Sequence, residues 1–343
     1  MTTAEELAMA HLFLERLGIS LEDLTNAAPP PAAPTFAEFI PIVSNAVPVG
    51  TRRVYKPYWG KLIKAWGALR IDEIVATDVN WFIEHTRKTA TVRRSSRGGH
   101  SAAEHGYRAL RCVYRYAIGN RVIDQRNDPT AMVARPKHVK SNRHAIDNTL
   151  LGEIAEVAST TGDDPALDAI IIRLHLETAA RRAGTLGLRR RDLDPERSLI
   201  NLCEKGDITR WQPVSPTLMK HLLHLTETRG DHDDDSPVLR YRNGKSITTR
   251  RYDYLWERIG QHVDTVRALG ISTHWLRHTT LTWVERSFGY AVARAYAGHA
   301  ASSTRFGVTA TYVRAGISEV AEALAALTGE AHPLAPAADP EPG

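Results

Sequence analysis

TAARRAGTLGLRRRDLD, residues 178–194, is the segment that says most about the architecture of this chain. It leads through a leucine-rich turn to three arginines that precede a strand-like run. A guanidinium at Arg181 can hold a phosphate oxygen with paired hydrogen-bond donors. Arg182 is a rival for that role. Taken alone, the segment would be an ordinary basic helix end, so its meaning depends on three further segments.

A β-hairpin is predicted directly after it. The strand-like runs SLINLCEK and TRWQPVS flank a Gly206-Asp207 turn. Lys205 lies at the tip, from which a lysine can reach into a site and protonate a leaving oxygen as a general acid. A lone lysine in a turn is usually an ordinary surface residue, so this role depends on the matching strand register.

STHWLRHTT, residues 272–280, is the third segment. Residues three apart on a helix share a face, so His274 and Arg277 can address the same group. A zinc site made by His274 and His278 is excluded, because no glutamate follows His274 as a metalloprotease helix requires. We expect His278 to contribute to packing.

AYAGHAASSTRFGVTATYVRAG, residues 295–316, supplies His299 and Tyr312. A tyrosine hydroxyl can attack phosphorus, and nearby cations can hold the negative charge that develops on the phosphate oxygens. Tyr290 and Tyr296 lie before or beside the histidine, and we interpret them as core or surface aromatic residues. The complete set needs no metal and no nucleotide cofactor; its members are Arg181, Lys205, His274, Arg277, His299 and Tyr312.

In this order, the four segments resemble the tyrosine recombinase (phage integrase) family over residues 36–328. The resemblance includes Arg210 and Pro213 after the hairpin lysine, and Thr309 three residues before Tyr312. It implies a fold that is mainly α with a small β-hairpin or sheet (α+β). A helical, SAM-like core-binding domain and a catalytic domain would close as a C-shaped clamp on DNA.

The resemblance also implies an activity, that of a site-specific DNA recombinase or integrase. Such an enzyme cuts and rejoins DNA strands through a 3′-phosphotyrosyl intermediate. The implied roles are phosphate binding by Arg181, Arg277 and His299, proton transfer by His274 and Lys205, and nucleophilic attack by Tyr312.

Three departures from the family pattern stand out. Ala179 replaces the usual glycine, and Gly184 stands where the family has an acidic residue that orients the first arginine. Without that acidic residue, Arg181 would be held in place by some other contact. The stretch from His299 to Tyr312 is longer than usual, which suggests a longer loop before the helix of the nucleophile.

Proline-rich and basic stretches divide the chain. AAPPPAAPT and KHVKSNRHAID have the composition of linkers. The expected parts are an N-terminal helical arm (1–26), a Pro-rich linker (27–35), a helical core DNA-binding domain (36–136), a basic linker (137–147), a catalytic domain (148–328) and a disordered tail (329–343).

The helical domain presents a basic surface. A helix with Tyr107, Leu110 and Tyr114 on its buried face is predicted to open at a capping box of Ser101 and Glu104. The basic segment RKTATVRRSSRGGH is either a loop that contacts phosphates or a solvated flexible loop, and its composition favours phosphate contacts. The candidate DNA-binding residues are Arg52, Arg53, Lys56, Arg93, Arg94, Arg97, Arg108, Arg111 and Lys140.

Composition agrees with double-stranded DNA as the partner. The 343 residues carry a formal net charge of +5, and the sequence pI is about 9.2, which favours a polyanion over an acidic substrate. Cys112 and Cys203 fit neither a zinc site nor a disulfide framework. A reduced, cytoplasmic setting is expected, with no signal peptide and no membrane span.

A last helix, 317–328, places Ile317, Val320, Leu324 and Leu327 on one face. In the resembled family such a helix packs into a neighbouring subunit, which implies a homo-tetramer on DNA. Simple packing on its own domain is the equal alternative.

Other functions stay open. A non-catalytic DNA-binding relative, acting as a repressor or architectural factor, fits the glycine at position 184 and the lengthened loop. A type IB topoisomerase-like enzyme would use similar groups for relaxation instead of strand exchange. A metal-dependent hydrolase built on DHDDD, residues 231–235, is the weakest reading, because that run has the character of a solvated acidic loop.

Overall fold

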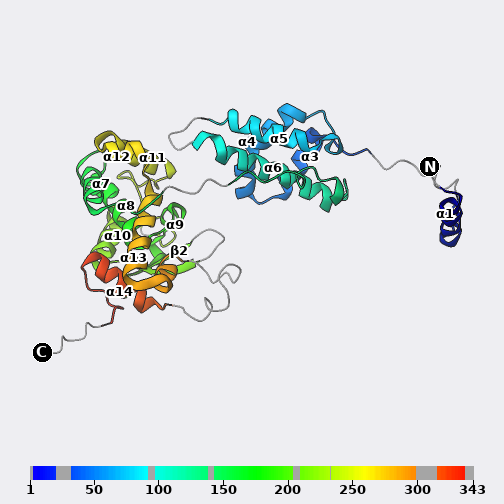
Figure 1. Ribbon diagram of the computed structural model, residues 1–343. Helices are drawn as coiled ribbons and strands as arrows, with labels where there is room; N and C mark the ends of the chain where they lie inside the picture. Colours follow the sequence, from blue (N-terminus) through cyan, green and yellow to red (C-terminus); the bar gives the residue numbers. More distant parts are fainter. Residues whose placement is uncertain are drawn as a thin grey trace. The chain divides into compact units, whose positions relative to one another are not determined.

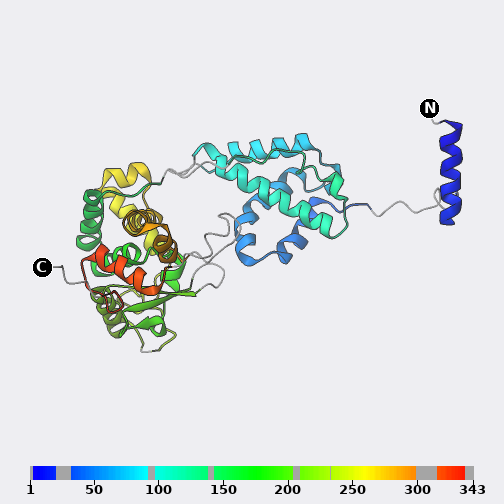
Figure 2. The same cartoon turned by 60° about the horizontal axis from the view of Figure 1, so that its bottom comes forward.

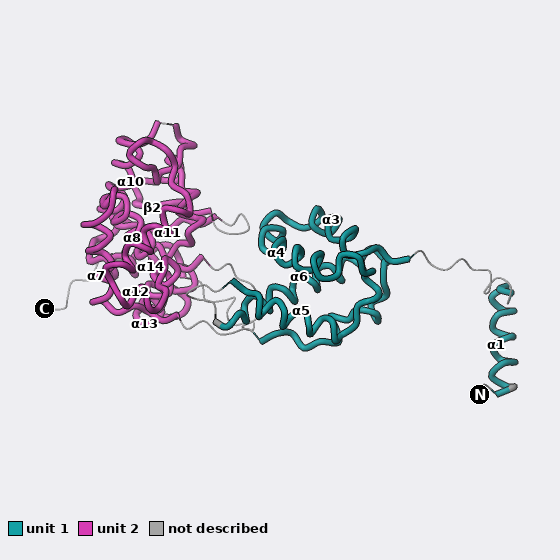
Figure 3. The backbone as a smooth tube through the Cα atoms, turned by 90° about the horizontal axis from the view of Figure 1, so that it is seen from above, with its two compact units in different colours: residues 1–140 teal, residues 141–343 magenta. Residues whose placement is uncertain are grey.

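The computed structural model describes residues 3–20, 32–91, 97–137, 143–203, 209–231, 233–298 and 315–336. The chain divides into two compact units, residues 1–140 and 141–343 (Figure 3). The division falls inside the basic segment 137–147. Across the described ranges, no helix has both the length and the apolar character needed to cross a lipid bilayer.

The first unit is helical (Figure 1). Its core is rich in aromatic side chains; Trp66, for example, packs its ring 5.6 Å from that of Phe36 and 5.3 Å from that of Phe82. The helix that carries Tyr107, Leu110 and Tyr114 buries all three, as predicted. The helices are α1 (Ala4–Leu17), α3 (Phe36–Ala46), α4 (Val49–Trp66), α5 (Ala76–Lys88) and α6 (His100–Gly119), with short 3-10 turns at Ile71–Glu73, Arg97–Gly99 and Gln125–Asn127.

The predicted capping box at the start of α6 is wrong. The N-cap is Gly99 and the helix begins at His100, two residues earlier than a cap at Ser101 would give, after Gly98 and Gly99 in the left-handed conformation. Glu104 is buried, and its carboxylate pairs with Arg108 at 2.6 Å and with Arg135 at 2.8 Å. The carboxylate of Glu104 therefore forms ion pairs and does not cap the helix terminus.

The second unit surrounds α8 (Pro165–Thr178), which has helices on several sides (Figure 1). Its apolar side chains are buried. The three strands form one antiparallel sheet in the order β1-β2-β3, with Leu202 opposite Arg210. The other elements are α7 (Asn148–Thr160), α9 (Arg182–Gly187), a 3-10 turn at Arg190–Asp192, β1 (Leu193–Asp194), β2 (Leu199–Cys203), β3 (Thr209–Pro213), α10 (Pro216–Arg229), α11 (Thr249–His262), α12 (Asp264–Leu269), α13 (Thr273–Tyr296) and α14 (Ile317–Thr328).

This mainly helical fold with one small sheet confirms the predicted fold class. β2 and β3 lie in the two strand-like runs, while the turn that joins them, residues 204–208, is outside the described part.

The last helix, α14, packs on its own domain (Figure 2). Val320 and Leu324 are buried in a cluster with Val284 and Tyr296 of α13. The segment after it is also docked, because Glu330 pairs with Arg173 of α8. The disordered tail expected from residue 329 therefore does not begin there: residues 329–336 belong to the described domain.

A buried ion cluster ties α8 to α11. The carboxylate of Asp168, which is 0% exposed, accepts hydrogen bonds from Arg251 at 2.8 and 2.6 Å and from Arg258 at 2.6 Å. Asp163, a second partner of Arg251 at 2.7 Å, has a side chain that is 76% exposed. The two aspartates thus offer a buried and an exposed member of the same cluster.

We expect Asp168→Ala to lower the free energy of unfolding of the second unit by about 3–5 kcal/mol, because two arginines lose their buried counter-charge. The matched variant Asp163→Ala should cost less than about 1 kcal/mol, because its pair is screened by solvent. Calorimetric unfolding of the full chain measures both. Equal losses in the two variants would contradict a special role for the buried carboxylate.

Candidate active site

The chain passes from the end of α8 to Arg181 through a left-handed turn. Ala179 has φ 48° and ψ 25°, and Arg181 follows in an extended conformation as the N-cap of α9. The left-handed conformation costs a residue with a Cβ about 1–2 kcal/mol, which explains why glycine is usual at this position in the resembled family. Here the fully buried alanine adopts it.

The neighbouring Arg182 is directed elsewhere. Its guanidinium lies 5.9 Å from the centre of the Tyr252 ring and 3.4 Å from a carboxylate oxygen of Asp253, both on α11. Arg181 instead lies near enough to Arg210 and Arg277 for its charge to lower the pKa of both. The structure thus separates the two rival arginines, and Arg181 is the one that joins the other cations.

Arg277 connects two backbone segments of the site. The side chain is 4% exposed, donates from Nη1 to the carbonyl of Ala179, and donates from Nη2 to the carbonyl of Ala297 at 2.7 Å. Its burial, and then the charges of Arg181 and Arg210, lower the pKa of the Arg277 guanidinium to about 9. A bound anion would relieve this repulsion, because an opposite charge favours the charged form.

Arg210 of β3 is a third guanidinium in the cluster. Nη2 donates to the carbonyl of Thr178 at 3.2 Å, and Nη1 donates to Oε1 of Gln212. Burial is the main cause that lowers the pKa of Arg210 to about 10. Sequence patterns single out Arg210 only as a marker of the hairpin. Strand alternation, which puts Arg210 and Gln212 on one face, was the available signal.

Gly298 lies against the Arg210 side chain. Its φ is +64°, and a Cβ added there would lie 2.3 Å from Cδ and 2.4 Å from Nε of Arg210. Such distances are far inside van der Waals contact. The glycine before His299 is therefore required both by the backbone conformation and by the approach of the arginine.

His274 lies on α13 one helical turn before Arg277. His274 is exposed, yet partial desolvation of its imidazole is the largest cause that lowers its pKa to about 4, followed by the charges of Arg143, His278 and Arg277. The two imidazoles of His274 and His278 meet edge to face at 5.1 Å. At neutral pH His274 is therefore uncharged and able to accept a proton.

Three of the predicted catalytic residues, Lys205, His299 and Tyr312, lie outside the described residues. Only their chain connections bear on the site. The segment that leads to His299 leaves at Ala297 and Gly298, which contact Arg277 and Arg210 respectively. Of the six, the structure brings together Arg181, His274 and Arg277, and it adds Arg210.

Residues 146–315, which hold this whole cluster, match the model of the phage integrase family. The chain belongs to this family, the tyrosine recombinases. Among curated relatives, tyrosine recombinase XerD of Lacticaseibacillus casei is 25% identical over 57% of this chain and 67% of its own length. Tyrosine recombinase XerC of Corynebacterium glutamicum is 25% identical over 45% of this chain; the chain thus spans half the length of that relative, 50%.

Solved structures agree on the fold. A lambda integrase tetramer bound to a Holliday junction has a TM-score of 0.62 at 12% identity, covering 92% of this chain and 87% of that one. The Tn1549 transposon integrase in complex with transposon right end DNA has a TM-score of 0.60 at 15% identity, covering 83% and 96%. At such identities the likeness concerns architecture alone.

In this tyrosine recombinase the first unit has a basic pocket of about 650 Å³ between α4 and α6. Tyr55 and Tyr116 line it together with Arg108, Arg111 and Arg115. Arg108 also pairs with Glu104 at 2.6 Å, and Nη1 of Arg111 donates to the Tyr107 hydroxyl at 3.2 Å. The two predicted arginines of α6 thus lie on one basic face.

The other predicted DNA contacts are placed in part. Arg52, Arg53 and Lys56 lie on α4, where Arg52 donates to the Asn45 carbonyl at 3.2 Å. Arg97 starts a 3-10 turn, and its side chain is not described. Arg93, Arg94 and Lys140 lie outside the described residues.

Aspartates of the acidic run at residues 231–235 form ion pairs with arginines. Asp231 pairs with Arg240 at 3.2 Å, and Asp235 pairs with Arg189 at 3.1 Å and also with Arg191. Within the described ranges, no three His, Cys, Asp or Glu side chains are grouped so that they could hold a metal ion. The solvated acidic loop is the better description of this run.

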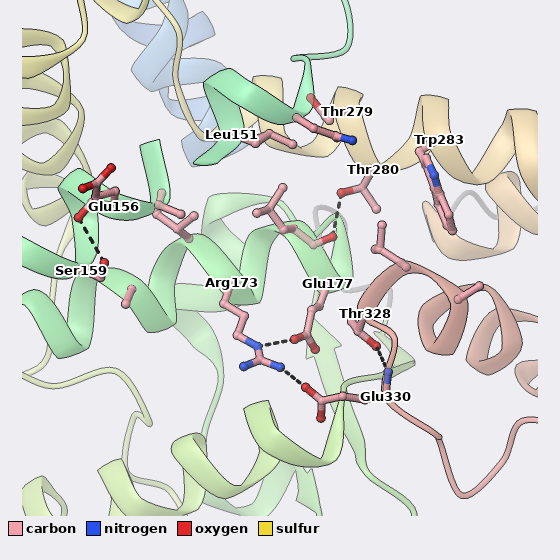
Figure 4. Close-up of a pocket in the computed structure, with 17 residues that line it drawn as sticks. Leu151, Glu156, Ser159, Arg173, Glu177, Thr279, Thr280, Trp283, Thr328 and Glu330 are labelled. Carbon is pink, nitrogen blue, oxygen red and sulfur yellow. Dashed lines mark hydrogen bonds and ion pairs between the residues drawn. The ribbon is translucent and has the colours of Figure 1, made fainter. Parts of the chain in front are cut away.

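A cavity of about 880 Å³ lies apart from the cationic cluster, between α7, α8, α13 and the end of α14 (Figure 4). On its wall Arg173 donates to Glu177 at 2.6 Å and pairs with Glu330 (Figure 4). Of the predicted catalytic side chains that the structure describes, none lines it. The cavity therefore marks where the C-terminal segment is anchored, and the candidate active site is the cationic cluster.

We expect Gly298→Ala to slow DNA cleavage by about 100-fold, because a catalytic group displaced by about 1 Å commonly costs that much. Gly270→Ala is the matched control. Gly270 has the same φ of +64°, but an added Cβ there meets nothing within 4 Å. Both variants carry the same backbone strain, so single-turnover cleavage rates isolate the collision with Arg210. Similar losses in both variants would refute it.

Proposed function

We propose that this chain is a site-specific DNA recombinase that cuts and rejoins strands through a 3′-phosphotyrosyl intermediate. The observation that carries the proposal is the convergence of Arg181, Arg210 and Arg277, where burial and then the charges of the other two arginines lower the pKa of Arg277. Guanidinium groups crowded together at one site are suited to bind a phosphodiester, because its charge offsets their repulsion. The family membership supports the same reading.

In the first step the Tyr312 hydroxyl oxygen attacks the scissile phosphorus. Its proton passes to a base, for which the uncharged imidazole of His274 is the candidate. Arg181, Arg277 and His299 stabilise the charge on the non-bridging oxygens of the pentavalent transition state. The bond to the 5′ oxygen breaks, and Lys205 protonates that oxygen as it leaves.

In the second step a 5′ hydroxyl from another duplex attacks the phosphotyrosyl bond. The tyrosine oxygen leaves and recovers a proton, and a new phosphodiester joins the exchanged strands. Each step forms one phosphorus–oxygen bond and breaks another, so no external energy source is required.

Double-stranded DNA is the proposed partner. The basic face with Arg108, Arg111 and Arg115 would contact the phosphate backbone, where such residues set position without reading sequence. We also propose a homo-tetramer on DNA. Because α14 buries Val320 and Leu324 in its own domain, linking subunits through α14 would require this helix to leave its present site.

The test uses DNA from the flanks of the gene itself, nicked near the exchange point so that cleavage is trapped. A covalent protein–DNA adduct on a denaturing gel is the expected result. Relaxation of supercoiled DNA without any site requirement would indicate a topoisomerase-like enzyme instead. Binding without an adduct, even with both partner sites supplied, would favour a non-catalytic DNA-binding relative.

A further inference from the structure

Three polar side chains are fully enclosed behind Arg181. His175 of α8 and Thr185 of α9 are 0% exposed, and Tyr252 of α11 is 1% exposed. Burying polar groups is unfavourable unless each finds a hydrogen-bond partner. The proposed mechanism assigns none of them a task.

The three side chains satisfy one another. Nε2 of His175 lies 3.0 Å from the Tyr252 hydroxyl, and that hydroxyl lies 2.8 Å from Oγ1 of Thr185. The imidazole and phenol rings meet nearly edge to face, with centres 5.4 Å apart. We call this the His175–Tyr252–Thr185 network.

Its outer contacts reach the backbone on both sides of one residue. Nδ1 of His175 donates to the carbonyl of Ala180 at 3.1 Å, and Oγ1 of Thr185 donates to the carbonyl of Arg182 at 3.0 Å. The backbone N–H of Thr185 donates to the carbonyl of Arg181 itself at 3.3 Å. The peptide groups before and after Arg181 are thus both held.

The chemistry of the contacts fixes the proton positions. A carbonyl only accepts, so Nδ1 of His175 carries the proton and Nε2 accepts from the Tyr252 hydroxyl. The single hydroxyl proton of Thr185 is then shared between the Tyr252 oxygen and the carbonyl of Arg182. Burial lowers the pKa of His175 to about 4, which keeps the imidazole neutral. A neutral network adds no charge beside the guanidinium groups of Arg182 and Arg277.

We propose that the His175–Tyr252–Thr185 network positions Arg181 for phosphate binding, an inference that rests on the proposed function. The network would replace the acidic side chain that the resembled family has at the position of Gly184. A side chain at position 184 would not point toward Arg181. A Cβ added to Gly184 would face β2, 3.4 Å from the carbonyl of Cys203 and 3.8 Å from Leu202. The network acts through the backbone instead. Its members are positioning residues and touch no substrate.

The test compares full-length Tyr252→Phe, Thr185→Val and Thr185→Ser. The first two remove a hydroxyl at nearly constant shape, and the serine retains it. We expect the first two to slow single-turnover cleavage of saturating nicked DNA by about 10-fold each, the effect of about one hydrogen bond. The double variant should be no slower, because both changes break one network. Thr185→Ser should cleave like wild type.

Two readouts distinguish positioning from simple stability. In an Arg181→Lys background, Tyr252→Phe should have no further effect on the cleavage rate, and DNA affinity should stay within about twofold of wild type. Hydrogen exchange at residues 179–185 should rise in Tyr252→Phe without any change in α14. A thermal shift with wild-type cleavage would overturn the inference.

Failure of the proposed function is recognised separately. Absence of an adduct from the wild type removes the recombinase proposal, whereas an adduct formed at equal rates by wild type and Tyr252→Phe removes only the network. The hydrogen-exchange measurement needs no activity. Unchanged exchange at residues 179–185 in Tyr252→Phe would therefore refute the network even in a chain that does not cleave.

Discussion

Tyr312→Phe is expected to abolish covalent capture of DNA while DNA affinity stays unchanged. Phenylalanine lacks the hydroxyl that would form the phosphotyrosyl bond, and no other step of the proposed reaction replaces it. The cations that would bind the phosphate are untouched. Trapping on nicked DNA, resolved on a denaturing gel, measures the adduct, and a gel-shift titration with the same DNA measures affinity.

Tyr290→Phe is the matched control for this experiment. Tyr290 is 51% exposed on α13 and precedes His299 in the chain, so it is the accessible rival for the nucleophile. Tyr296 is a poor rival, because it is fully buried and its hydroxyl donates to the carbonyl of Glu177. Adduct formation by Tyr312→Phe, or its loss in Tyr290→Phe, would refute the assignment of Tyr312.

Arg277→Ala is expected to lower the cleavage rate by about 100- to 1000-fold, the usual cost of one transition-state donor. We expect a loss at the upper end of this range, because the variant also frees the carbonyls of Ala179 and Ala297 that Arg277 holds. DNA affinity should fall much less, since binding is shared by many phosphate contacts. Single-turnover rates at saturating DNA give the first quantity and salt-controlled titrations the second.

Arg286→Ala supplies the control, because Arg286 is an exposed arginine on the same helix. It should leave the cleavage rate unchanged. Arg277→Lys separates charge from geometry: the ammonium keeps the charge but cannot reproduce the two-pronged contact of a guanidinium. Equal losses of binding and cleavage in Arg277→Ala would contradict its assignment to the transition state.

Local patterns were sufficient to predict much of the fold. The buried face of α6 follows from apolar residues three and four apart, and α14 occupies the range that its apolar stripe indicates. The helix boundary at His100 was missed because Glu104 pairs with Arg135, a contact 31 residues away that no local pattern contains. The docking of Glu330 on Arg173, 157 residues apart, was missed for the same reason.

The candidate site was predictable in its residue types but not in its arrangement. Spacing alone placed His274 beside Arg277 on α13. The place of Arg210 depends on its contacts with Thr178 and Gly298, which lie on separate elements. The His175–Tyr252–Thr185 network joins three helices, so no single stretch of sequence contains it. The roles of Lys205, His299 and Tyr312 stay predictions.

The two backbone contacts of Arg277 have an evolutionary consequence. Its guanidinium fastens the turn at Ala179 to the end of α13 at Ala297. A descendant that binds DNA but no longer exchanges strands could lose the hydroxyl of the nucleophile without any effect on this fold. Drift should therefore erase Tyr312 early and spare Arg277, so a silent copy would be recognised by its missing tyrosine rather than by its arginines.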